Sequence, residues 1–315
     1  MNVVLLESLG ISKEVLDSYA EKLKEQGHNF AAYEKDTDTE VMVERAKEAD
    51  IVMIANMPLK GEVISRCKNL KFIDVAFTGV DHVDLETAKS MGIAVSNASG
   101  YSNESVAELV MGMILSLLRN VPQVEVRCRE GKTKDGLVGR ELKGKTVGVV
   151  GTGAIGSRTA ELCHAFGCNI LAYDLYPKKN APEYIKYVTL EELLSNSDIV
   201  TLHCPLTEES RHLINKERIA LMRPKTILIN AARGPVVDSD ALAEALNNDK
   251  IGGAGIDVFE IEPPLNTDHP LLHSKNTIVT PHIAFASEES MKLRAKIVFE
   301  NIDKWMNGEQ VNTIL

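Results

Sequence analysis

Three short segments contain the side chains with the clearest chemical potential. Arg233 lies in Asn-Ala-Ala-Arg-Gly at 230–234, Glu262 directly precedes two prolines, and His282 lies in Thr-Pro-His-Ile-Ala at 280–284. A guanidinium binds a carboxylate through two parallel hydrogen bonds. A histidine, whose unperturbed pKa is about 6.5, exchanges a proton near neutral pH, and a carboxylate beside it favours the charged ring. The three residues therefore predict a site that anchors an anion and transfers a proton.

A glycine-rich turn lies earlier in the chain. The sequence Gly-Thr-Gly-Ala-Ile-Gly at 151–156 follows an apolar run at 146–150 and opens a helical pattern. In that context G-x-G-x-x-G predicts dinucleotide binding. Gly151 allows the tight turn, Gly153 lets the backbone approach a pyrophosphate, and Gly156 lets the helix pack against the strand. The N-terminus of the helix then offers unpaired N–H groups to the phosphates.

An acidic residue follows this turn at the expected distance. Asp174 ends the next predicted strand, 18 residues beyond Gly156. A carboxylate in this position holds the adenosine ribose hydroxyls and repels a 2′-phosphate, so we expect NAD rather than NADP as the cofactor. Lys178 and Lys179 follow closely and could soften that preference, although we interpret them as solvated surface lysines.

The elements that position these residues follow an alternating pattern. Short apolar runs predict strands and are separated by plausible helices; the runs lie at 3–6, 51–54, 72–75, 94–96, 146–150, 170–174, 199–203, 226–230, 255–258 and 277–280. Such alternation predicts parallel sheets covered by helices on both faces. Each of the three segments with chemical potential begins at or just after the end of a predicted strand, which is where open α/β sheets bind their ligands.

Helical spacing is clearest at 13–26, 102–119 and 288–305. The second of these helices is apolar over much of its circumference, so we expect it to be buried. Within it, Ser105 and Glu108 have the spacing of a capping box. The segment 127–145 is more polar and contains several glycines, and no element is assigned to it.

Composition limits the classes of protein to which the chain can belong. Its 315 residues are enough for two domains, and 44% of them are hydrophobic. The formal net charge of −10 disfavours nucleic acid and membrane partners, although a local arginine can still hold a small anion. Five cysteines without zinc-type pairs fit a reducing compartment. No secretory signal and no run of about 20 apolar residues is present, so we expect a cytoplasmic protein without a bound metal.

In this order, the motifs resemble those of the D-isomer-specific 2-hydroxyacid dehydrogenase family. The resemblance covers essentially the whole chain and includes Thr-Gly-Val-Asp at 78–81 and Tyr-Ser-Asn at 101–103. It implies an α/β protein with two doubly wound parallel-sheet domains. A Rossmann NAD-binding domain at 98–286 would be inserted into a flavodoxin-like substrate domain formed by 1–97 and 287–315. It also implies that the protein forms a homodimer and that it binds a small-molecule 2-oxo or 2-hydroxy acid.

The resemblance assigns a role to each of the three residues. Hydride passes between NAD(H) and C2 of a 2-oxo acid, while Arg233 binds the carboxylate and ketone of that acid. His282 donates a proton to the ketone oxygen, or accepts it in the reverse direction, and Glu262 favours the charged imidazole ring. Glu260 is the rival for the position of Glu262, which we prefer because it directly precedes Pro263.

Further site residues are implied by the same resemblance. His203 and Cys204, in the loop after the third strand of the Rossmann domain, are expected to form the wall of the cofactor site, and Asp257 to lie near the nicotinamide amide. The full set expected to bind the cofactor is Gly151, Gly153, Ala154, Ile155, Gly156, Asp174, His203, Cys204, Pro205, Thr207, Ser210, Ala231, Ala232, Arg233, Asp257, His282, Ala284, Asn103 and Val106. The set expected to bind the substrate is Thr78, Gly79, Val80, Tyr101 and Arg233. The other histidines, His82, His164, His212, His269 and His273, are interpreted as structural or surface residues.

Several related activities remain as alternatives. Formate dehydrogenases have glutamine at the position of Glu262, which argues against that reaction. The longer phosphoglycerate dehydrogenases have an added regulatory domain, which we do not expect in a chain that ends at Leu315, but a short one stays open. Phosphite oxidation is less favoured, and L-alanine or adenosylhomocysteine chemistry has no supporting motif. Some relatives are NAD-sensing transcriptional corepressors that bind partner peptides, and the complete Arg–Glu–His set favours the enzyme over that class.

Overall fold

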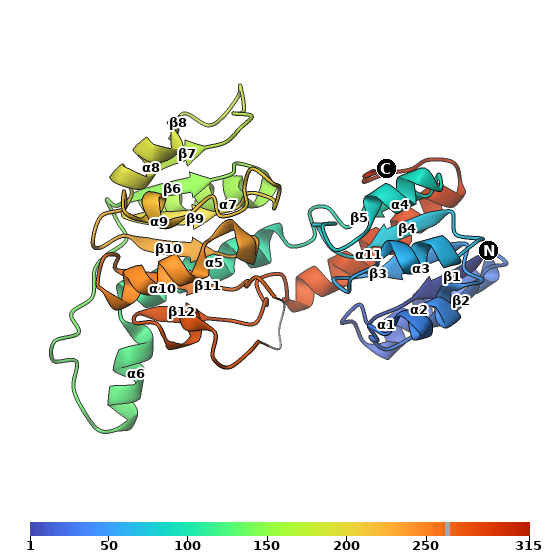
Figure 1. The fold of residues 1–315 in the computed structure, drawn as a ribbon, viewed down its shortest axis with the longest axis horizontal. Coiled ribbons are helices and arrows are strands. Elements are labelled where there is room, and N and C mark those ends of the chain that lie inside the picture. The colour runs from blue at the N-terminus through green and yellow to red at the C-terminus, as the bar shows by residue number, and fades with distance from the viewer. Residues whose placement is uncertain (262–264) are drawn as a thin grey trace. The chain divides into compact units, whose positions relative to one another are not determined.

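The computed structural model describes residues 1–261 and 265–315, so the expected catalytic residue Glu262 lies outside the described residues. The chain divides into two compact units, Met1–Ser102 with Ala286–Leu315, and Asn103–Phe285 (Figure 1). The first boundary lies five residues later than the sequence predicts, which is after residue 97. Residues 98–102 belong to the first unit because they pack on it: the Ala98 N–H donates to the Phe77 carbonyl over 3.0 Å.

The first unit contains a five-stranded parallel sheet with the strand order β2-β1-β3-β4-β5. Its strands are β1 (Asn2–Leu5), β2 (Asn29–Ala32), β3 (Ile51–Ile54), β4 (Phe72–Val75) and β5 (Ala94–Asn97). Its helices are α1 (Lys13–Glu25), α2 (Thr39–Ala46), α3 (Gly61–Arg66), α4 (Leu85–Ser90) and α11 (Glu288–Met306). The C-terminal helix α11 joins this unit through apolar packing, since Trp305 stacks on Phe72 of β4 with ring centroids 4.8 Å apart.

The second unit contains a seven-stranded parallel sheet with the order β12-β11-β10-β9-β6-β7-β8, which Figure 1 shows as successive arrows. Its strands are β6 (Thr146–Val150), β7 (Asn169–Tyr173), β8 (Ile185–Tyr187), β9 (Ile199–Leu202), β10 (Ile227–Asn230), β11 (Gly253–Ile256) and β12 (Thr277–Val279). The expectation of two parallel α/β sheets is confirmed. The expectation of six strands in this unit is wrong, because it omits the edge strand β8, whose residues Ile-Lys-Tyr do not form an apolar run.

Helices cover both faces of the seven-stranded sheet. Its helices are α5 (Asn103–Leu118), α6 (Val121–Arg129), α7 (Ala154–Ala165), α8 (Leu190–Asn196), α9 (Lys216–Ile219) and α10 (Ser239–Asn247), with 3₁₀ turns η1 (Gly234–Val236) and η2 (Pro270–His273). One apolar core joins α8, α9 and α10 to the sheet, and a second joins α5 and α7 to it. Burying both faces explains why the strands read as continuous apolar runs.

The apolar helix α5 is buried as expected, with seven of its residues in the core. The capping box expected at Ser105 is wrong, because α5 begins at Asn103 and places Ser105 inside its first turn. The Ser105 hydroxyl instead donates to the Phe285 carbonyl over 3.3 Å. Helix α6, which starts before the polar segment 127–145 and ends within it, was not expected, and none of its residues is buried.

No single helix among the described residues is long and apolar enough to cross a bilayer. The adjacent helices α5 and α6 pass that test only as a pair, and they are bent by 63° at the break between them.

Candidate active site

The expected site residues of the second unit lie along one edge of its sheet. Val150, Leu202 and Asn230 are paired in register on β6, β9 and β10, and Ile256 and Val279 are paired on β11 and β12. The residues that follow these strand ends are therefore neighbours, with about 4.8 Å between adjacent strands. The chain leaves β6 toward β7 and returns on the other side through β9, so the switch point of this open sheet lies at the glycine turn.

The glycine turn has the geometry that a dinucleotide needs. Gly151 has a φ of +92°, and a Cβ on it would lie 2.8 Å from the Cys204 amide nitrogen. A Cβ on Gly156 would lie 1.9 Å from the Gly151 carbonyl oxygen. By contrast, a Cβ on Gly153 would meet nothing within 4 Å, although Gly153 caps α7 without a side-chain hydrogen bond. Gly153 thus leaves open space at a helix N-terminus, which fits the approach of a pyrophosphate.

This contrast between the glycines gives a stability and binding prediction. Gly153→Ala is expected to fold with an unchanged melting temperature, because the added methyl group has no protein neighbour. The variant should bind NADH at least tenfold more weakly, since the methyl group occupies the space through which the phosphates approach. Gly156→Ala is the matched control and should lower the melting temperature, because its methyl group overlaps the Gly151 carbonyl. Thermal unfolding and fluorescence titration with NADH measure both effects, and a Gly153→Ala protein with parental NADH affinity would contradict the assignment.

Asp174, immediately after β7, is held by two hydrogen bonds from the glycine turn and one from its own loop. Its Oδ2 accepts from the Thr152 N–H over 2.6 Å and from the Thr152 hydroxyl over 2.8 Å, and its Oδ1 accepts from the Tyr176 N–H over 2.9 Å. Burial raises the pKa of this carboxyl, but these bonds and the nearby charge of Lys178 outweigh burial and lower the pKa overall. Asp174 is therefore a fixed anion at neutral pH.

His203 and Cys204 follow β9 beside the glycine turn, as expected. The His203 Nε2 lies 2.9 Å from the Thr201 hydroxyl, and burial lowers the pKa of the ring to about 4. Burial likewise raises the pKa of the Cys204 thiol to about 11. At neutral pH His203 is thus uncharged and Cys204 is a thiol, which suits both to a wall rather than to proton transfer or nucleophilic attack.

The loop that contains Arg233 is shaped by its neighbours. The buried Asn230 side chain donates to the Arg233 carbonyl over 2.9 Å and accepts from the Ala232 N–H over 3.1 Å. A Cβ on Gly234 would lie 1.9 Å from the carbonyl carbon of Phe259, so this loop presses directly on the segment that follows β11. Tertiary packing therefore fixes the backbone that presents the Arg233 guanidinium, whose Nη1 donates to the Ala232 carbonyl over 2.8 Å.

The segment that contains His282 is held by Asp257, at the end of β11. The buried Asp257 carboxylate accepts from the Thr280 hydroxyl over 2.5 Å and from the Ile283 and Ala284 N–H groups over 2.9 Å each. His282 itself has a φ of +54°, and its N–H donates to the Asp257 carbonyl over 2.7 Å. These four bonds stabilise an uncommon backbone conformation for a non-glycine residue. The three bonds to the carboxylate occupy three of its roughly four acceptor positions, which leaves one position for a ligand.

Glu260, the rival for the position of Glu262, has partners of its own. Its Oε2 lies 3.1 Å from the His269 Nε2. Burial raises the pKa of the Glu260 carboxyl, but hydrogen bonds from Ser239, its own backbone N–H and His269 outweigh burial and lower it overall. Glu260 thus belongs to a local pair with His269, a histidine expected from the sequence to be structural or at the surface.

The other expected cofactor residues lie on the same edge of the sheet. The loop after β9 is fixed by mutual bonds, since the Ser210 hydroxyl donates to the Pro205 carbonyl over 2.7 Å and accepts from the Thr207 N–H over 2.7 Å. Ala231 and Ala232 follow β10, and Ala154 and Ile155 form the first turn of α7. The first turn of α5, with Asn103 and Val106, reaches the end of the His282 segment through the bond from Ser105 to Phe285.

The residues expected to bind substrate, other than Arg233, belong to the first unit. Thr78, Gly79 and Val80 follow β4, and the Asn97 side chain fixes their loop by donating to the Thr78 carbonyl over 2.6 Å. Tyr101 is buried, with its ring centroid 6.1 Å from that of Phe77. The Arg294 guanidinium lies over the Tyr101 ring, 5.8 Å from its centroid.

Sequence reasoning missed two residues that act on this edge. Thr152, the residue between the first two glycines of the motif, binds Asp174 through both its N–H and its hydroxyl. Tyr187 of β8 lies 2.9 Å from the Thr152 hydroxyl through its own hydroxyl. No local pattern could have paired Thr152 with Tyr187, because the contact depends on the position of β8 at the edge of the sheet.

Comparisons with known proteins agree with this geometry. The model of the D-isomer specific 2-hydroxyacid dehydrogenase NAD-binding domain matches residues 111–284. A hydroxypyruvate reductase from Blautia hydrogenotrophica is 38% identical over 288 residues, which cover 88% of each chain. A D-3-phosphoglycerate dehydrogenase from Methanocaldococcus jannaschii is 41% identical over 281 residues, which cover 88% of this chain and 53% of that protein.

Among solved structures, a D-lactate dehydrogenase from Aquifex aeolicus, complexed with NAD and lactic acid, superposes with a TM-score of 0.87. It is 35% identical to this chain, and the alignment covers 98% of this chain and 96% of that one.

Proposed function

Because the chain belongs to the D-isomer-specific 2-hydroxyacid dehydrogenase family, we propose that it transfers a hydride between NAD(H) and a D-2-hydroxy acid or its 2-oxo acid. One observation carries this proposal: the order of groups along the edge of the seven-stranded sheet. Asp174 and the glycine turn lie toward one end of that edge, and Arg233 and His282 lie toward the other. An extended dinucleotide bound across the switch point would bring its nicotinamide to Arg233 and His282.

Arg233 is proposed to anchor the substrate. Its planar fork can pair with the carboxylate and the adjacent ketone oxygen of a 2-oxo acid, which fixes one face of the ketone. Fixing that face is what makes the transfer specific for one isomer. NADH supplies the hydride at C2 when it is bound, and the backbone around Arg233, Asn230 and Gly234 keeps the anchor in place.

His282 is proposed as the acid–base catalyst. As the ketone carbon gains the hydride, negative charge develops on the ketone oxygen, and a proton from the imidazolium neutralises it. In the oxidative direction the neutral ring accepts the proton of the hydroxyl group. The alternative histidine at this edge, His203, is unsuitable as the acid because burial lowers its pKa to about 4.

Glu262 is proposed as the partner of His282, on the strength of its place in the family motif before Pro263. A carboxylate there would favour the imidazolium.

We also propose that Asp257 uses its remaining acceptor position for the nicotinamide amide. Thr78, Gly79, Val80 and Tyr101 are proposed to contact the substrate, with backbone N–H groups of the loop after β4 donating to its carboxylate.

The particular 2-oxo acid is best found with a panel. We expect NADH absorbance to fall with at least one of glyoxylate, hydroxypyruvate, pyruvate, a branched-chain 2-oxo acid and 3-phosphohydroxypyruvate. The last acid tests a phosphoglycerate dehydrogenase activity, which the similarity to the Methanocaldococcus jannaschii protein favours as the second candidate. If no acid is turned over while NADH binds tightly, the dehydrogenase proposal fails and a role as an NAD-sensing binding protein takes its place.

A homodimer is proposed from the exposure of α6. In Figure 1, α6 and the loop after it extend away from the sheet. No residue of α6 is buried, and Val126 and Val138 are 53% and 78% exposed. A second copy of the chain would cover these side chains, and sedimentation velocity tests this.

The cytoplasm is the proposed location, since all five cysteines are free thiols, as expected in a reducing compartment.

A further inference from the structure

A chain of hydrogen bonds runs from the loop after β7 to Asp174. The Lys178 N–H donates to the Tyr187 hydroxyl over 3.3 Å, and the Tyr187 hydroxyl lies 2.9 Å from the Thr152 hydroxyl. The Thr152 hydroxyl lies 2.8 Å from Asp174 Oδ2. These hydrogen bonds thus connect β8, the loop after β7 and the glycine motif to the single carboxylate of Asp174.

The direction of every proton in this chain is determined. Asp174 is an anion and can only accept, so the Thr152 hydroxyl must donate to it. The Thr152 hydroxyl has one proton, so it must accept from Tyr187. The Tyr187 oxygen is then free to accept from the Lys178 N–H. Tyr187 therefore orients the Thr152 hydroxyl, and Thr152 in turn orients Asp174.

The orientation of Asp174 matters because few of its acceptor positions remain. Both acceptor positions of Oδ2 are taken by Thr152, and one of Oδ1 is taken by the Tyr176 N–H. A single position on Oδ1 is left for a ribose hydroxyl. A carboxylate held in this way cannot rotate away from a 2′-phosphate, so its negative charge would repel the phosphate.

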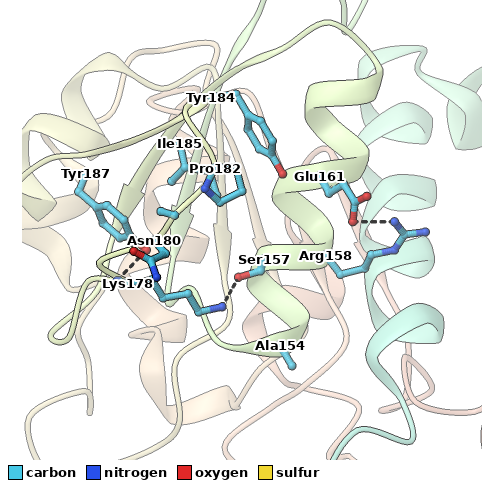
Figure 2. Close-up of a pocket in the computed structure, with 11 residues that line it drawn as sticks. Ala154, Ser157, Arg158, Glu161, Lys178, Asn180, Pro182, Tyr184, Ile185 and Tyr187 are labelled. Carbon is cyan, nitrogen blue, oxygen red and sulfur yellow. Dashed lines mark hydrogen bonds and ion pairs between the residues drawn. The ribbon is translucent and has the colours of Figure 1, made fainter.

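A pocket of about 470 Å³ opens beside this chain, between α7 and the loop that leads to β8. Figure 2 shows Tyr187 and Lys178 in its wall, with the Lys178 ammonium reaching across to the Ser157 hydroxyl of α7 over 2.8 Å. The wall thus already holds a cation close to Asp174. A phosphate in this position would have space and a positive partner, and it would be repelled by the fixed carboxylate.

We propose that Tyr187 is a positioning residue that sets the preference for NAD over NADP by holding Thr152 and Asp174 in place. The inference rests on the proposed role of Asp174 at the adenosine ribose. Without the Tyr187 hydroxyl, the Thr152 hydroxyl loses the donor that orients it, and the Lys178 N–H loses its acceptor. Asp174 and the loop after β7 then gain freedom, so the ribose hydroxyl is bound less well and a 2′-phosphate is repelled less.

The test compares Tyr187→Phe with Tyr184→Phe. Tyr184 lines the same pocket, but its ring stacks on His164 and its hydroxyl has no part in the chain of bonds. Dissociation constants for NADH and NADPH are measured by fluorescence titration, which needs no turnover. Tyr187→Phe is expected to lower the preference for NADH over NADPH by about fivefold, the effect of one net hydrogen bond, and Tyr184→Phe should leave the ratio unchanged.

A second variant tests whether Tyr187 acts through Thr152. Thr152→Val removes the hydroxyl between Tyr187 and Asp174, so adding Tyr187→Phe to it should lower the ratio much less than Tyr187→Phe lowers it in the parent protein. Equal weakening of both cofactors by Tyr187→Phe, or an additive effect in the double variant, would overturn the inference and leave Tyr187 as a packing residue. If the parent protein itself shows no preference for NADH, the proposed role of Asp174 fails as well.

Discussion

Replacing His282 with asparagine is expected to lower kcat by about 10²–10⁴-fold, the usual contribution of a general acid or base. Asparagine is the better variant because His282 has a φ of +54°, a left-handed conformation that asparagine adopts more readily than alanine. The four bonds between Asp257 and residues 280–284 do not involve the imidazole, so the segment should keep its shape. The dissociation constant for NADH should therefore change far less than kcat.

The pH dependence of the two directions adds a further measurement. Reduction of the 2-oxo acid needs the protonated ring and should slow as pH rises, whereas oxidation of the hydroxy acid needs the neutral ring and should slow as pH falls. His282→Asn should lose both limbs. His164→Asn is the control, because His164 lies near the end of α7 and stacks on Tyr184. Parental kcat in His282→Asn would remove this residue from the mechanism.

Replacing Arg233 with lysine is expected to lower kcat/KM for the 2-oxo acid by about 10²-fold, and replacing it with alanine by about 10³-fold. Lysine keeps the positive charge but cannot form two parallel bonds, so it loses the fixed orientation of the ketone. Alanine also loses the charge-assisted bonds, each worth about 1.5–3 kcal/mol. Steady-state kinetics with the best acid of the panel gives both values.

The binding of NADH separates this role from a structural one. The backbone of residues 230–234 is held by Asn230 and by the close approach of Gly234 to Phe259, neither of which uses the guanidinium. Both Arg233 variants should therefore melt at the parental temperature and bind NADH within about threefold of the parent, since the fork holds the ketone whereas the cofactor is expected to be held by many groups besides Arg233. Parental kcat/KM in Arg233→Lys would show that the fork geometry is unimportant and that charge alone binds the substrate.

The sequence by itself determined the parallel α/β architecture and the strand ends that hold the site. The strands at 51–54, 72–75 and 146–150 have the expected bounds, because each is buried on both faces and reads as an uninterrupted apolar run. The glycine motif could be recognised from the sequence because its turn and its close contacts exclude any side chain larger than hydrogen at Gly151 and Gly156. Arg233, Glu262 and His282 were predicted as site residues because each lies at or just after the end of a predicted strand, and strand ends are the ligand edge of such sheets.

Only the tertiary structure decided how those residues are held. The Asp257 carboxylate binds three donors of residues 280–284, and Gly234 presses on Phe259, although neither pair is close in sequence. The edge strand β8 was not predicted because its residues Ile-Lys-Tyr do not form an apolar run, yet its Tyr187 reaches Asp174 through Thr152. Local patterns record which residues are buried, but the order β12-β11-β10-β9-β6-β7-β8 arises from long crossover connections. That order determines which polar groups meet, and so it determines the finer chemistry of the site.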